Sequence, residues 1–412
     1  MGLMENVGRK ALDQVIDTLL LRLLRDPYVE NLWELVSTTM KVTPLQLVEI
    51  VLRAESGKPL GRPFGTVYHY SPWQELMFNP VHLVRLPTKD QKDVDTRVTL
   101  GPKAKRPLEL KIPILLTGMS YGGALSKQAR IALAKASTQA GTATNTGEGA
   151  YIPEEREYAN KYIYQYHRGL WPHGNKTEFY ALADMIEIQL GQGAQASTPQ
   201  TTKAEQIDEE FREIFGLEEG EDMVIDSRLR GVESPADLKR LVARLKEETG
   251  GVPIAYKFAA SHYIEKEIEI ALEAGIDVIV VDGAEAGTHA GQPLLEDDFG
   301  LPTMHALVRA ADFLEEKGAK DEVSLIAAGG LFSPGHFLKA MALGADAVYI
   351  GTAAVMAMIH TQMVETAPLE PPTQLALYSG RLKTELDINR AAASLTNYLQ
   401  SCVAEMALGA VA

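Results

Sequence analysis

Eight short apolar runs, alternating with longer helical patterns, constrain the fold of this 412-residue chain more than any other feature. Several runs are apolar almost throughout, as parallel strands buried on both faces are. Helical patterns lie between many of the runs, so the chain reads as eight successive βα units. The predicted strands are 112–117, 142–145, 162–166, 186–190, 253–258, 277–282, 323–328 and 345–350.

Eight βα units in succession favour an α/β fold of the (β/α)8 barrel type, with a doubly wound sheet as the rival arrangement. A barrel of this kind takes about 250 residues, which leaves chain for flanking segments. The predicted division is an N-terminal helical and extended segment over residues 1–105, a barrel over 106–365, and a C-terminal helical tail over 366–412 that packs on the barrel. An acidic excursion, residues 204–221, separates the fourth and fifth strands.

Both flanks contain helical patterns. The apolar stretch Ile16–Leu24 is too short to span a bilayer and carries Asp17 and Arg22, which predicts an amphipathic helix and no membrane span. Thr43–Gln46 has the sequence of a capped helix start, with an end expected at Gly57. In the tail, apolar residues from Ile388 to Met406 recur at helical spacing, which is typical of a helix that packs on a domain.

Charge and cysteine usage exclude several classes of protein. The formal net charge is −15 and no dense run of lysine and arginine occurs, so nucleic-acid binding is not expected. Cys402 is the one cysteine, which excludes an internal disulfide framework and a cluster ligated by cysteines of this chain. No metal site is predicted, and a reducing, cytoplasmic setting is expected.

Glycine-rich turns follow the last two predicted strands. Gly329-Gly330 ends the seventh strand and Gly351-Thr352 ends the eighth. In (β/α)8 enzymes the loops after these strands frequently form a phosphate site. Glycine lets the backbone approach an anion, and the start of the next helix contributes free N–H groups and a positive dipole end. The two turns together therefore predict a phosphate clamp.

Several segments, in chain order, resemble signatures of the FMN-binding domain of the glutamate synthase family. Residues 113–126 (PILLTGMSYGGALS) resemble its MSFGALS signature, and 145–149 (NTGEG) resemble its NTGEG signature. Residues 191–194, 282–288 and 326–353 resemble its QGAK, DGxxGGT and GG…GADAVxxGTA segments. The match spans residues 80–365. The chain resembles the single-domain form of the family, as in the flavin subunit of N-methylglutamate synthase, more closely still. The strand at Tyr164–Tyr166 and the segment Asn397–Leu399 also recur in that form.

The resemblance implies an FMN cofactor lying across the barrel mouth. Met119 and Ser120 would line its ring, Asn145 and Gln189 would offer polar contacts, and Lys257 would stabilise negative charge on the reduced ring. The remaining implied cofactor-binding residues are Asp282, Gly283, Gly287, Thr288, Gly329, Gly330, Gly351 and Thr352.

The implied catalytic residues are Lys257, Glu148 and Gln192, with Glu148 as a hydrogen-bond acceptor for an amine or imine or, alternatively, as a structural carboxylate. The lysine that follows the family's Gln-Gly-Ala is Gln195 in this chain, so one cation expected near a dicarboxylate is missing. Arg228 and Arg230 are predicted to supply the missing cation, and an equally good interpretation is that they are solvated loop arginines.

His289 stands where the family usually has a small residue, and it is predicted either to contact the substrate or to be an ordinary loop histidine.

These implications predict an oxidoreductase that passes a hydride from reduced FMN to the imine of a 2-oxoacid, giving an amino acid. Two alternatives stay open: other flavin chemistry on the same barrel, such as a 2-hydroxyacid oxidase or an isomerase, and a non-catalytic flavin subunit. The expected partners are a 2-oxoacid with ammonia or an amine, and an electron-donor or amidotransferase subunit. The chain is expected to form a homo-oligomer and to bind neither nucleic acid nor a membrane.

Overall fold

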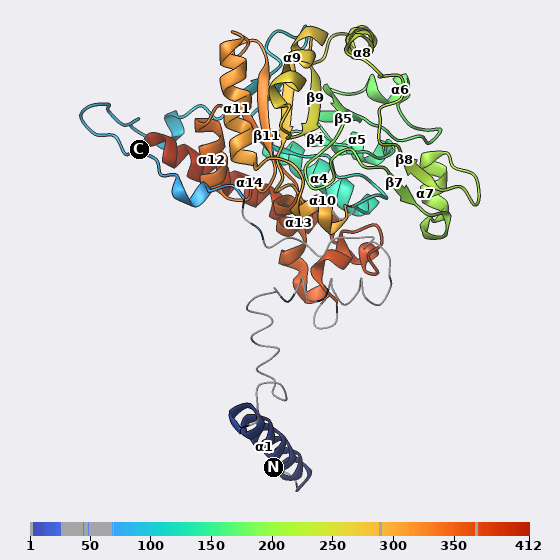
Figure 1. Ribbon diagram of the computed structural model, residues 1–412, viewed down its shortest axis with the longest axis vertical. Coiled ribbons are helices and arrows are strands. Elements are labelled where there is room, and N and C mark those ends of the chain that lie inside the picture. The colour runs from blue at the N-terminus through green and yellow to red at the C-terminus, as the bar shows by residue number, and fades with distance from the viewer. Residues whose placement is uncertain are drawn as a thin grey trace. The chain divides into compact units, whose positions relative to one another are not determined.

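A computed structural model describes residues 3–25, 44, 48, 68, 70–287, 291–366 and 370–412 (Figure 1). The chain separates into two compact units, Met1–Phe64 and Gly65–Ala412. The first unit contains the helix α1 (Leu3–Arg25), which confirms a helix over Ile16–Leu24. Within the helix predicted from Thr43 to Gly57, Pro44 and Val48 are described and are helical, and the remaining residues lie outside the described ones. In the described parts of the chain, no helix is long and apolar enough to cross a membrane.

The second unit is built on eight parallel strands, joined in the order β3-β12-β11-β10-β9-β6-β5-β4. The gap between the first and last of these is bridged as well, since the Leu116 N–H donates to the Ala143 carbonyl at 3.2 Å. The sheet therefore closes into a (β/α)8 barrel, which confirms the predicted fold over the doubly wound alternative. The strands are β3 (Ile114–Leu116), β4 (Thr144–Asn145), β5 (Tyr162–Tyr166), β6 (Met185–Gln189), β9 (Ile254–Ala259), β10 (Val278–Asp282), β11 (Ser324–Ala328) and β12 (Ala347–Ile350).

Helices follow the strands and cover the barrel on the outside (Figure 1). Ser234 caps α8 and Ser333 caps α12, each accepting a backbone N–H through its side chain. The helices are α4 (Lys127–Ala140), α5 (Pro153–Tyr158), α6 (Thr177–Tyr180), α8 (Pro235–Glu248), α9 (Ile264–Ala274), α10 (Pro293–Asp297), α11 (Thr303–Glu316), α12 (Pro334–Ala342) and α13 (Thr352–Ile359).

The barrel interior is apolar at one end and polar at the other. At the amino ends of the strands, the hairpin of β1 (Val98–Leu100) and β2 (Leu108–Leu110) packs Leu100 and Leu108 against inward-facing Val278 and Ile326. Beyond this layer, towards the carboxyl ends, the inward positions carry Asn145, Gln165, Glu187, Gln189, Lys257 and Asp282, all buried. Buried polar side chains are retained where they are bonded to one another or to a ligand, so the carboxyl-terminal mouth is where function is to be sought.

The predicted excursion between the fourth and fifth strands is confirmed. It contains β7 (Gln200–Thr202), α7 (Glu209–Phe215) and β8 (Met223–Ile225), with β7 and β8 antiparallel. Phe211 and Phe215 of α7 pack with Tyr121 and Tyr378 into a separate apolar cluster. The excursion thus covers the loop that follows β3, the first barrel strand.

The C-terminal helix α14 (Ile388–Val411) confirms the predicted tail helix. It packs on α4, α12 and α13, and its apolar stripe joins the core outside the barrel. The predicted division of the chain at residues 105 and 365 remains a prediction.

The lone thiol provides a test of this packing. Cys402 is buried in the stripe of α14, and burial raises the pKa of its thiol to about 11. Because the thiolate is the reactive form, we expect iodoacetamide at pH 8 to label the folded protein on the order of 100-fold more slowly than the urea-unfolded chain. Mass spectrometry of timed samples measures both rates, and rapid stoichiometric labelling of the folded protein would show that α14 does not pack as described.

Candidate functional site

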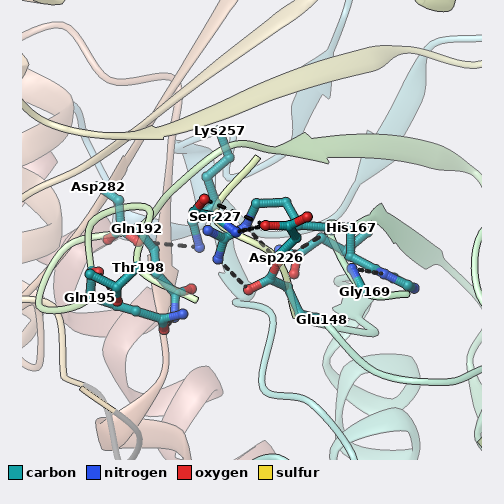
Figure 2. A network of polar contacts seen from close by, with 12 residues as sticks. Glu148, His167, Gly169, Gln192, Gln195, Thr198, Asp226, Ser227, Lys257 and Asp282 are labelled. Carbon is teal, nitrogen blue, oxygen red and sulfur yellow. Dashed lines mark hydrogen bonds and ion pairs between the residues drawn. The ribbon is translucent and has the colours of Figure 1, made fainter. Parts of the chain in front are cut away.

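A buried lysine lies at the centre of the polar mouth. Lys257, on the inner face of β9, is 1% exposed, and its Nζ lies 3.3 Å from Asp282 Oδ2 at the end of β10. The ammonium also donates to Thr117 Oγ1 at 3.3 Å. Figure 2 shows Lys257 and Asp282 within the polar network of the mouth. Burial alone would lower the pKa of Lys257, but the carboxylates of Asp282 and Glu187 outweigh it and raise the pKa above its usual value. Lys257 is therefore held in its charged form beside these two carboxylates.

Glu187 on β6 accepts hydrogen bonds from side chains of β4 and β5. Its Oε1 accepts from Asn145 Nδ2 at 2.9 Å and from Gln165 Nε2 at 2.7 Å. Its Oε2 has no partner among the described residues. Gln189, two positions further along β6 and fully buried, has no described partner for either side-chain atom. A buried amide whose donor and acceptor both lack a described partner is suited to a ligand that offers an acceptor and a donor.

Arg168 and Glu148 form a second buried pair, in the loops after β5 and β4. Arg168 Nε donates to Glu148 Oε1 at 3.0 Å and its Nη2 donates to Oε2 at 2.9 Å. Glu148 also acts electrostatically on Lys257, and Figure 2 shows the two side chains in the same network. The sequence reasoning missed Arg168, although a cation directly after the third predicted strand was a signal that could have drawn attention to it.

The loop after β6 is held in a strained conformation at the edge of the network. Gln192 Nε2 donates to Gln195 Oε1 at 2.6 Å, and Gln195 is 2% exposed (Figure 2). Ala194 and Ala196 have φ values of 61° and 51°, a region that alanine rarely adopts. A Cβ on Gly193 would lie 1.9 Å from the Gly283 carbonyl oxygen, so this loop and the β10 loop are in close contact. Such strain persists where surrounding contacts impose it.

The predicted clamp glycines lie on two adjacent strand ends, since β11 pairs with β12. Gly329 and Gly330 have φ values of 112° and 65°, and a Cβ on Gly330 would lie 2.6 Å from Glu285 Cβ. The fold therefore requires glycine here whether or not an anion binds. Gly351 immediately precedes α13, whose first residue is Thr352, and Ser333 caps α12. Two helix starts thus lie beside each other at the mouth.

A buried arginine ties two predicted ring-lining turns together. Arg130 of α4 is fully buried and donates to the carbonyl oxygens of Met119 at 2.6 Å and Asn145 at 2.7 Å. It also pairs with Glu155 of α5. Met119 and Ser120 are half-buried. The turn after β3 is therefore held by Arg130 on its inner side and is partly exposed on its other side.

Comparison with known proteins identifies the family. The model of the conserved region in glutamate synthase matches residues 67–410. The chain belongs to the glutamate synthase family. This confirms the predicted family and the predicted enzyme type, an oxidoreductase of the glutamate synthase type.

Curated relatives of the family span more chain than this protein. A glutamate synthase large subunit-like protein of Rhizobium meliloti is 34% identical over 76% of this chain and 70% of its own length. The archaeal-type glutamate synthase [NADPH] of Thermotoga maritima is 33% identical over 73% of this chain and 60% of its own. The archaeal glutamate synthase [NADPH] of Archaeoglobus fulgidus is 34% identical over 66% of this chain and 52% of its own. The chain thus corresponds to between half and 70% of these relatives.

Among solved structures, a mandelate oxidase mutant with the C4a-OH-FMN adduct is 15% identical, with a TM-score of 0.46 over 78% of this chain and 81% of that one.

Not every predicted site residue of this glutamate synthase family member joins the network. Arg228 is exposed and pairs with Glu233 at 3.1 Å, and Arg230 is exposed in the same loop. Thr288 and His289 lie outside the described residues. Gly287 approaches the start of α13, because a Cβ there would lie 2.8 Å from Thr352 Oγ1. In the described ranges, no group of histidine, cysteine, aspartate and glutamate side chains is arranged to hold a metal ion.

Proposed function

We propose that the barrel mouth binds FMN. The observation that carries this proposal is Gln189, a fully buried amide with no described partner at either atom. The pyrimidine edge of a flavin offers both a donor and acceptors, which this amide and Asn145 would complement. Lys257 places a cation beside Gln189, since the two residues pair in register across β6 and β9. The full proposed set is Met119, Ser120, Asn145, Gln189, Lys257, Asp282, Gly283, Gly287, Thr288, Gly329, Gly330, Gly351 and Thr352.

We propose further that the protein forms an amino acid from a 2-oxoacid and ammonia or an amine. Bound and reduced, FMN supplies the hydride that such a reduction of an imine needs. Lys257 contributes the fixed positive charge that favours the reduced, anionic cofactor. Glu148 and Gln192 face the substrate as hydrogen-bonding groups, and Gln195 offers an Nε2 that has no partner among the described residues.

The experiment that tests this function is anaerobic reduction of the purified, FMN-loaded protein followed by addition of 2-oxoacid and amine pairs. We expect the absorbance of oxidised flavin to return only when both members of a pair are present, with an amino acid formed in equal amount. Return of absorbance with a 2-hydroxyacid product, or with no pair at all, would contradict the proposed reaction.

A glutamine arm of the same experiment examines the need for a partner. Cys402 is the one cysteine of this chain and it is buried, so it does not provide the nucleophile for glutamine hydrolysis. We therefore propose that ammonia or an amine comes from solution or from an amidotransferase subunit, and electrons from a soluble donor or a partner chain. Glutamine turnover by the purified chain alone would refute this. The lone cysteine also fits the proposed cytoplasmic setting.

A charge placed at the start of α12 tests the clamp. Gly330→Val is unsuitable, because the positive φ and the contact with Glu285 would strain it without any ligand. Gly335, in the first turn of α12, is exposed, and the nearest atom to an added Cβ is Ser333 Oγ at 3.9 Å. We expect Gly335→Asp to raise the Kd of FMN by about 10-fold or more, because its carboxylate repels the phosphate.

The matched control for this variant is Gly335→Ala, which adds a Cβ without charge and favours the helix. Fluorescence titration of flavin-free protein measures both dissociation constants. Equal FMN affinity in the two variants would remove the start of α12 from the phosphate site.

A further inference from the structure

We propose that Arg168 binds the carboxylate of the substrate, an inference that rests on the proposed 2-oxoacid function. Arg168 follows β5 in the chain, and its partner Glu148 lies in the loop after β4, so both belong to the carboxyl-terminal mouth. Glu148 and Lys257 interact electrostatically and lie in one network (Figure 2). A ligand at Arg168 would thus lie close to the cation that faces the proposed flavin.

The guanidinium of Arg168 has one nitrogen more than its structural contacts use. Its Nε and Nη2 bind both oxygens of Glu148, and its backbone N–H donates to Oε1 at 3.4 Å. Its Nη1 is buried and has no partner among the described residues. A charged donor left without an acceptor in a buried site is costly, and a carboxylate is the acceptor whose geometry matches a guanidinium.

The other candidate cations are engaged or exposed. Lys257 is paired with Asp282. Arg228 pairs with Glu233 at the surface, with its side chain 77% exposed, and Arg230 is exposed in the same loop. Gln195, at the position where the family usually has lysine, offers only a neutral donor, Nε2, which also has no described partner. Arg168 is therefore the buried cation at the mouth with an unused donor in the described part of the chain.

The test separates recognition of a charge from support of the fold. The probes are 2-oxoglutarate and its two monoamides, each of which replaces one carboxylate with a neutral group of similar size. Isothermal titration calorimetry of the FMN-loaded protein gives the preference for the acid over each amide. The variants are Glu148→Gln, the double variant Glu148→Gln/Arg168→Gln, Arg228→Ala and Arg230→Ala. The first two differ only at Arg168: Glu148→Gln keeps the buried guanidinium but removes its carboxylate partner, and the double variant removes both charges of the pair.

We expect the unaltered protein to prefer the acid by about 10-fold or more over one of the monoamides, as a charge-assisted hydrogen bond from the unused Nη1 predicts. Glu148→Gln should keep this preference, whereas the double variant should bind the acid and that monoamide with equal affinity. FMN content and melting temperature identify a variant that has not folded, and in that case Arg168→Lys, which keeps the charge but loses the fork, is measured for the same loss.

Two outcomes would overturn the inference. If the double variant weakens the acid and both amides equally, Arg168 supports the loops only. If the preference instead disappears in Arg228→Ala or Arg230→Ala, the exposed arginines bind the carboxylate. Failure of the proposed function looks different: the unaltered protein would still bind 2-oxoglutarate with the stated preference, but its reduced flavin would not be reoxidised by any 2-oxoacid and amine.

Discussion

Replacing Lys257 with methionine is expected to destabilise the folded protein by about 3 kcal/mol or more, because it leaves the buried Asp282 carboxylate without its partner. Lys257 and Asp282 are 1% and 4% exposed, and their charged atoms lie 3.3 Å apart. Burial raises the pKa of Asp282 and Lys257 opposes that rise, so the variant should hold Asp282 protonated at higher pH than the unaltered protein does. Urea unfolding followed by tryptophan fluorescence measures the loss.

The same substitution should lower the two-electron reduction potential of bound FMN by ~20–45 mV, which corresponds to about 1–2 kcal/mol of lost charge stabilisation. The matched control is the double variant Lys257→Met/Asp282→Asn, which removes both charges. We expect the double variant to recover much of the stability, because no buried charge remains unpaired, while its potential stays below that of the unaltered protein. A potential that is unchanged in both variants would show that Lys257 does not contact the flavin.

The stability of the protein is expected to fall as the pH drops below about 6.5, in part because of His167. Burial, and secondarily the charge of Arg168, lower the pKa of His167 to about 3. Its Nδ1 accepts the Gly169 N–H at 3.0 Å, and its ring stacks on that of Trp171 with the two ring centroids 4.4 Å apart. The folded state therefore holds the neutral imidazole. The unfolded chain binds a proton below pH 6.5 and the folded protein does not, so stability rises with pH between about 3 and 6.5.

The size of this effect follows from the shift of the pKa. His167 should account for a loss of about 2 kcal/mol in the free energy of unfolding between pH 7.5 and pH 5, and on the order of 4 kcal/mol by pH 3. The measurement compares the pH dependence of the unaltered protein with that of His167→Gln, whose amide can still accept the Gly169 N–H but does not titrate. Parallel curves for the two proteins would contradict the assignment of a buried neutral histidine.

The barrel could be predicted from the sequence because its strands are specified locally. Runs such as those ending at Asp282 and Ala328 are apolar along both faces, which only a strand buried on both faces satisfies. Strand ends were less certain: the prediction placed the first strand at 112–117, whereas β3 spans Ile114–Leu116. Pairing with neighbours, which the local pattern does not encode, decides where a strand stops.

The candidate site was also predictable in part from the sequence and in part only from the tertiary structure. The sequence by itself determined which residues lie towards the carboxyl ends of the strands, and so placed Lys257, Asp282, Asn145 and Gln189 at one mouth, because carboxyl ends of parallel strands meet at the same end of a barrel. It did not determine their partners. The pairing of Arg168 with Glu148, and the bonds from Arg130 to the Met119 and Asn145 carbonyls, join separate βα units. Such contacts depend on side chains that meet only after the barrel closes, so the tertiary structure alone decided which cation is buried with a donor to spare and which lies in solvent.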